Sequence, residues 1–167
     1  QIDSGFLAYK DDNHLITLFN GRHGSAHGHA ALGSVTINLN KQDIIGDPGR
    51  FTYMYDSPLR MGLKKQWMHN TVDVDNKEDF KISGDSSYAE VQDPIGNAYN
   101  QKGNYVALEG SWSGKANITE KENGKTLEKN LYTVRRTAFI ENKIAAGGEK
   151  EEIQTSYQEE RQHCCDK

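Results

Sequence analysis

The sequence predicts an all-β protein, a single-domain β-sandwich or barrel of about nine to eleven short antiparallel strands with at most one or two short helices. Three observations predict it. Short runs of β-branched and aromatic residues recur along the chain, turn residues separate them about every 8–12 residues, and the 167 residues include 16 glycines and eight tyrosines. The long helical crossovers and continuous Val/Ile runs typical of a parallel sheet are missing.

The first half begins with an expected hairpin. The apolar runs Gly5–Lys10 and His14–Phe19 are separated by Asp11-Asp12-Asn13, and Asp and Asn favour turns because they tolerate left-handed conformations. A strand with one buried and one wet face is expected over Ser34–Asn40, because its apolar residues recur with a period of two.

The middle of the chain has weaker signals. We expect an aromatic-rich strand over Arg50–Tyr55, a short strand over Thr71–Asp75 and a strand fragment at Phe80–Ile82. Leu59–Asn70 has a helical stripe at spacing four, which Gly62 weakens. The stretch from 92 to 104 is rich in Gly, Asn and Asp and is interpreted as the longest loop.

The second half has the clearest turn. Asn123-Gly124 accepts positive φ at both centres of a type I′ turn, so Lys115–Lys121 and Lys125–Val134 are expected to pair as a hairpin. Thr137–Ile140 is a further strand. We assign residues 1–148 to the all-β domain and 149–167 to a charged C-terminal tail or short helix.

Composition excludes some partners. The net charge is −4, which gives no attraction to nucleic acid, and no apolar run approaches the roughly 20 residues of a transmembrane helix. Cys164 and Cys165 are adjacent, so they favour a free tail or a dimer cross-linked through either one over an internal disulfide. Asn117-Ile118-Thr119 is a glycosylation sequon, and it favours a secreted or cell-surface location.

The stretch Gly21–His29 is the best candidate for a chemical site. His23, His27 and His29 lie within seven residues and are separated mostly by small residues. On a strand, His27 and His29 would point to one face and could bind one divalent metal ion, with His23 joining from the loop. His14 and His69 are candidates for distant ligands.

Two short motifs resemble those of known barrel families. Gly21, five residues and then His27-x-His29 resemble the opening of the first cupin motif, although no acid follows between Ala30 and Asn40. That resemblance implies a metal held inside a barrel. Gly110-Ser111-Trp112 resembles the Gly-x-Trp of the first lipocalin strand, where the tryptophan closes the barrel.

The lipocalin resemblance implies a small-ligand site. Trp112 would lie at this site, with Arg135 or Arg136 stacking on its ring through a cation–π contact. The alternative is a core tryptophan beside a glycine bulge. No nucleophile elbow, phosphate-binding loop or structured Cys/His pair is present.

The sequence therefore favours a non-enzymatic, exported binding or interaction protein, whose ligand is a small molecule or a partner protein. The alternative is a metal-dependent enzyme with a cupin-like barrel that uses His27 and His29. Membrane binding through the aromatic and basic segment Leu59–Asn70 ranks last.

Overall fold

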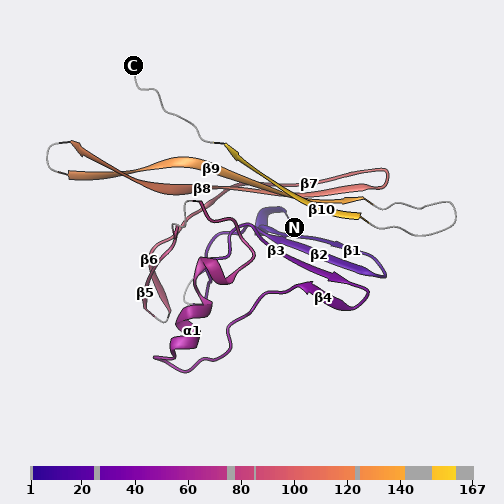
Figure 1. Ribbon diagram of the computed structural model, residues 1–167, viewed down its shortest axis with the longest axis horizontal. Coiled ribbons are helices and arrows are strands. Elements are labelled where there is room, and N and C mark those ends of the chain that lie inside the picture. The colour runs from indigo at the N-terminus through magenta and orange to yellow at the C-terminus, as the bar shows by residue number, and fades with distance from the viewer. Residues whose placement is uncertain are drawn as a thin grey trace, which may run out of the picture.

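Two four-stranded antiparallel sheets face each other across the core of this computed structural model (Figure 1). It describes residues 2–24, 27–74, 78–84, 86–122, 125–141 and 152–160, with the backbone alone for 115–131 and 152–160. Together with a separate two-stranded sheet, the described residues form a β-sandwich. The fold class expected from the sequence is confirmed, and the sandwich replaces the barrel alternative.

Within each of the two large sheets, strands that follow one another in the chain are also neighbours in the sheet. The first sheet has the order β1 (Phe6–Lys10), β2 (His14–Phe19), β3 (Ser34–Leu39), β4 (Gln42–Ile45). The second has the order β10 (Glu152–Glu160), β9 (Lys125–Glu141), β8 (Tyr105–Glu122), β7 (Pro94–Lys102). The 3₁₀ turn η1 (Ile2–Ser4) precedes β1. Between the two large sheets in the chain lie helix α1 (Pro58–Leu63), the 3₁₀ turn η2 (Gln66–Met68) and the strand pair β5 (Lys81–Gly84) and β6 (Ser87–Glu90).

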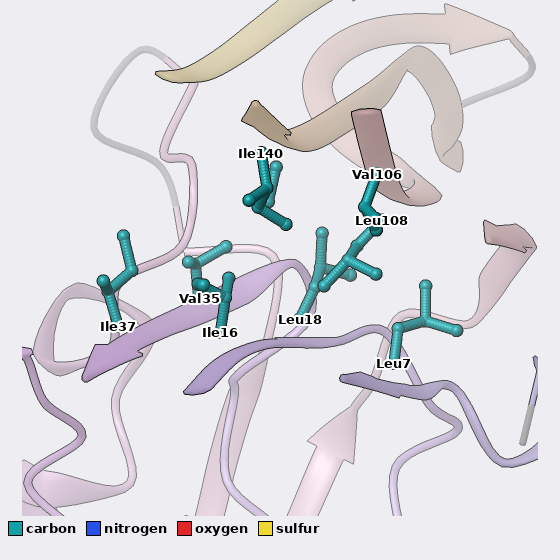
Figure 2. Close-up of a cluster of buried hydrophobic side chains, with 9 residues drawn as sticks. Leu7, Ile16, Leu18, Val35, Ile37, Val106, Leu108 and Ile140 are labelled. Atoms are coloured by element: carbon teal, nitrogen blue, oxygen red, sulfur yellow. The ribbon is translucent and has the colours of Figure 1, made fainter. Parts of the chain in front are cut away.

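The main core lies between the two large sheets. Alternate residues of β1–β3 point towards β8 and β9, and apolar side chains from both sheets interlock there, as Figure 2 shows. This alternation is the period of two that the sequence shows over Ser34–Asn40. The buried set is Leu7, Ile16, Leu18, Val35, Ile37, Val106, Leu108, Ala138 and Ile140.

A second core cluster surrounds Trp112, which is 1 % exposed. Its ring lies against Gly33, whose φ is +70°. A Cβ atom at this glycine would lie 2.1 Å from the ring atom Cη2 of Trp112. The start of β3 therefore approaches β8 closely only because residue 33 has no side chain.

Both hairpins expected from the sequence are present. β1 and β2 pair from Phe6↔Phe19 to Lys10↔Leu15, and the Asp11 carboxylate between them accepts the backbone N–H groups of Asn13 and His14. β8 and β9 pair as far as Glu122↔Lys125. Asn123 and Gly124 themselves lie outside the described residues.

The strand expected at Arg50–Tyr55 is wrong. The backbone there is irregular, because Phe51 and Asp56 have φ values of 66° and 58°, which interrupt an extended strand. Of the short strand expected at Thr71–Asp75, residues 71–74 are described, and they contain a single bridge at Val74. The helical stripe of Leu59–Asn70 also fails, because Lys65 is extended and ends the helix after one short stretch.

Two expectations near the second sheet are wrong as well. The expected long loop 92–104 contains β7, which pairs with β8 from Pro94↔Trp112 to Lys102↔Tyr105. Instead of a short helix in the C-terminal tail, Glu152–Glu160 forms β10 and pairs with β9. In both cases the backbone hydrogen bonds of a neighbouring strand outweigh weak local propensity.

No helix among the described residues has the length and apolarity to cross a membrane.

Gly33→Ala should destabilise the protein by about 3 kcal/mol, because a left-handed alanine costs about 1–2 kcal/mol and the added methyl group overpacks the site. Gly49→Ala is the matched control, since Gly49 also has positive φ but nothing lies within 4 Å of its added Cβ. This control substitution should lower the free energy of unfolding by about 1 kcal/mol. Urea unfolding measures both. Equal losses would contradict the close approach to Trp112.

Candidate functional site

A cavity of about 230 Å³ lies on the outer face of the first sheet. Since neighbouring residues of a strand point to opposite faces, the side chains between the core positions of β1–β3 line this cavity. They supply two phenyl rings and three hydroxyl groups. The lining residues are Phe6, Thr17, Phe19, His29, Ala31, Ser34, Thr36, Asp47 and His69.

Three connecting segments bring His29, Asp47 and His69 to one end of the cavity. His29 precedes β3, Asp47 lies in the turn after β4, and His69 follows η2. The Nδ1–H of His69 donates to Oδ2 of Asp47 at 2.7 Å, and the ring centroids of His29 and His69 are 5.2 Å apart. Residues separated by 40 positions therefore form one polar cluster.

The segment that holds His69 is fixed by its neighbours. The side-chain amide of Asn70 donates to the carbonyl of Gly46 at 2.6 Å. The carbonyl of Asn70 accepts from the backbone N–H of Val35 and from the guanidinium of Arg136. The hydroxyl of Thr71 donates to the carbonyl of Leu32. These bonds attach the segment to both large sheets and to the turn that contains Asp47.

Burial keeps the pKa of His29 low, so its imidazole is neutral at pH 7. Burial lowers the pKa of His29 to about 4, and the nearby His69, Arg50 and Lys64 add to this effect while Asp47 opposes it. The hydrogen bond from His69 holds the pKa of Asp47 below its usual value. The cluster therefore joins an ionised carboxylate to an uncharged imidazole.

His69 carries a polar atom with unused bonding capacity. Its side chain is 1 % exposed, and its Nε2 has no hydrogen-bond partner among the described residues. When Nδ1–H is held by a carboxylate, Nε2 of a neutral imidazole presents a lone pair. The cluster can thus accept a hydrogen bond from a ligand hydroxyl or coordinate a cation.

The side chains of His23, His27 and His29 lie in three different surroundings. The His23 ring lies edge-on to Tyr88, with centroids 4.3 Å apart. His27 contacts Arg50, and only His29 lines the cavity. Among the described residues, no three His, Cys, Asp or Glu side chains are grouped to hold a metal ion, so metal binding by this histidine set stays a prediction.

The predicted ligand pair Trp112 and Arg135 is not brought together. Trp112 lies inside the second core cluster. Arg135 is paired with Glu109 at 3.7 Å, and its side chain is 46 % exposed. Their cross-strand partners are Val134 and Ser111, which places the two side chains on opposite faces of the sheet. Arg136, and not Arg135, lies on the same inner face of the sheet as Trp112.

Asp47 is the member of the cluster that sequence reasoning missed. It lies in the sequence Gly46-Asp47-Pro48-Gly49, which indicates a turn, and its Oδ1 does accept the N–H of Gly49. Because the turn alone explains an aspartate at this position, the sequence gives no sign that the same carboxylate also binds His69. His69 was only a candidate distant ligand, because sequence cannot place it beside His29.

Residues 2–150 match the family described as Heparinase II/III-like, C-terminal. The chain belongs to this family. The cupin and lipocalin resemblances are therefore replaced by a different β-fold family, and the short motifs that carried them have other structural roles. The comparison with curated proteins gave no match.

A solved heparinase III structure, whose lysines are methylated, has the same sandwich as this heparinase II/III-like domain. The TM-score is 0.53 at 16 % sequence identity, over 86 % of this chain and 22 % of the heparinase III chain. At this identity the likeness concerns the fold alone. The chain spans about a fifth of the length of that enzyme.

We predict that His29 titrates with a pKa of about 4 in protein treated with a chelator. Asp47→Asn should lower this pKa further because it removes an anion, and His69→Gln should raise it because it removes the side chain that lowers the pKa of His29. Proton–nitrogen NMR of the imidazole signals measures each value. Because unfolded His29 titrates near 6.5, the His29 contribution lowers stability as pH falls from about 6.5 to about 4. A normal pKa would contradict the burial of His29.

Proposed function

We propose that this domain binds an acidic polysaccharide, with one sugar unit in the cavity that His29, Asp47 and His69 close at one end. The observation that carries the proposal is the buried Nε2 of His69, which has no partner among the described residues and belongs to a residue that lines the cavity. An unpaired buried acceptor costs about 1–3 kcal/mol, so a ligand hydroxyl that donates to it is stabilised.

The other walls of the cavity suit the same ligand. The rings of Phe6 and Phe19 offer apolar faces for the C–H groups of a pyranose ring. Ser34 supplies a hydroxyl whose Oγ is buried and has no partner among the described residues. A few polar groups placed among apolar walls are typical of small-ligand sites.

Family membership supports the acidic class of polysaccharide. Heparin, which the name heparinase indicates as substrate, carries carboxylate and sulfate groups. The sequence-based hypothesis of a binding protein agrees with this proposal, and the ligand class becomes narrower than a small molecule or a partner protein. Export to the cell surface or medium belongs to the same proposal, because such polysaccharides are extracellular.

Phe19→Ala should weaken heparin-oligosaccharide binding about tenfold, because truncating a buried aromatic contact commonly costs more than 1 kcal/mol. Phe139→Ala is the matched control, since Phe139 stacks on Tyr105 in the other sheet. Isothermal titration calorimetry measures both, with thermal unfolding as a check of the fold. Failure of the unmodified chain to bind heparin in preference to neutral dextran would contradict the proposal, and so would equal losses in the two variants.

We also propose a divalent metal ion at the same cluster as a second candidate. A carboxylate that orients one imidazole nitrogen and leaves the other free is typical of metal-binding histidines, and His69 has this arrangement. His29 supplies a second imidazole. The cluster is not preformed as a three-ligand set, so binding would require small side-chain shifts.

Metal analysis separates the two candidates. Untagged protein dialysed against Zn²⁺ should retain about one ion per chain, because two imidazoles and a carboxylate match zinc chemistry. His29→Asn and His69→Asn should each abolish retention, whereas His27→Asn should not, since that ring contacts Arg50 instead. Mass-spectrometric metal analysis gives the stoichiometry. Retention unchanged in both cluster variants would contradict this site.

A further inference from the structure

Arg50 is a cation beside the cavity with unused donors. It lies three residues after Asp47, and its charge lowers the pKa of His29. Its Nη1 donates to Nδ1 of His27 at 2.6 Å. Its Nε and Nη2 are buried and have no partner among the described residues, and no carboxylate among these residues pairs with it.

The two unused nitrogens lie on the same edge of the guanidinium group. Such an edge matches the two oxygens of a carboxylate or sulfate group, to which arginine binds through two parallel hydrogen bonds. The opposite edge is already used by His27. The guanidinium is therefore oriented by the protein while its side that would recognise an anion remains unsatisfied.

An aromatic loop covers this guanidinium. The Tyr53 ring lies 4.3 Å from the Arg50 guanidinium carbon, and Phe51, Tyr53, Met54 and Tyr55 are each more than 70 % exposed. Exposed aromatic side chains in one segment are typical of a binding surface.

The backbone of the aromatic loop is held from below. The buried Arg60 of α1 donates to the carbonyls of Tyr53 at 3.0 Å and Met54 at 3.2 Å. It also donates to Oγ of Ser86 at 3.1 Å. The backbone that carries the exposed Tyr53 ring is thus fixed by α1.

We propose that Arg50, oriented by His27 and covered by Tyr53, binds the acidic group of the sugar unit next to the one in the cavity. This inference rests on the proposed function and names the residue that selects acidic over neutral polysaccharide. Nε–H and Nη2–H donate to the carboxylate or sulfate oxygens, and Tyr53 turns to stack on the same sugar ring.

The first test compares charge-matched variants in heparin-oligosaccharide binding. Arg50→Ala should weaken binding at least tenfold, and Arg50→Lys should recover only part of it because lysine lacks the two-pronged edge. Arg135→Ala removes the same charge from an exposed arginine paired with Glu109 and should leave binding unchanged. Equal losses in Arg50→Ala and Arg135→Ala, or no loss in Arg50→Ala, would overturn the inference.

A second test distinguishes the role of Arg50 from sugar binding in the cavity. If Phe19→Ala weakens heparin binding and Arg50→Ala does not, the proposed function stands and the role of Arg50 is wrong. The Nε–H NMR signal of Arg50 is also followed with glucuronate, glucose 6-sulfate and glucose at equal concentration. A shift with glucuronate alone identifies a carboxylate site, and a shift with the sulfate alone identifies a sulfate site. No shift with either acid, or the same shift with glucose, would overturn the role of Arg50 even if heparin fails to bind.

Discussion

The alternation of side chains along β2 and β3 is the constraint on which the rest of the structure depends. Ile16, Leu18 and Val35 face the second sheet and close the core. The residues between them, Thr17 and Ser34 among others, line the cavity on the opposite face. Because the period of a strand is two, a shift of register by one residue would exchange the core and the cavity walls. The core and the cavity are thus encoded in alternate residues of the same strands.

The sequence predicted the fold where local signals are strong. The Asp11–Asn13 turn, the alternating segment before Asn40 and the Asn123-Gly124 turn each specify a hairpin or strand through neighbouring residues alone. The errors occur where pairing decides the structure. β7 is polar and rich in turn residues, yet it is a strand because β8 offers it a partner. Arg50–Tyr55 is rich in aromatic residues, which is typical of a strand. However, the Arg60 side chain donates hydrogen bonds to the carbonyls of Tyr53 and Met54, which a neighbouring strand would otherwise have to bind.

The candidate site was only partly predictable for a related reason. His29 could be singled out because histidines cluster in one short stretch, but the stretch itself does not form the site. Asp47 and His69 join His29 through loops whose paths depend on contacts with both sheets. The Arg50 guanidinium had no signal of its own, since an arginine in an aromatic segment usually covers apolar surface. Spatial convergence of loops is the information that one-dimensional patterns lack.

The hydrogen bonds of Arg136 have a consequence for the order of folding. This guanidinium donates from β9 to the carbonyls of Gly33 and Asn70, groups that lie 103 and 66 residues earlier in the chain. Such contacts close large loops, and their entropic cost delays them. The histidine stretch and its strands are made before β9, but the segment that carries His69 gains the bond from Arg136 only after β9 has docked. The long-range bonds of Arg136 therefore tie the segment that carries His69 to the docking of a strand that comes much later in the chain.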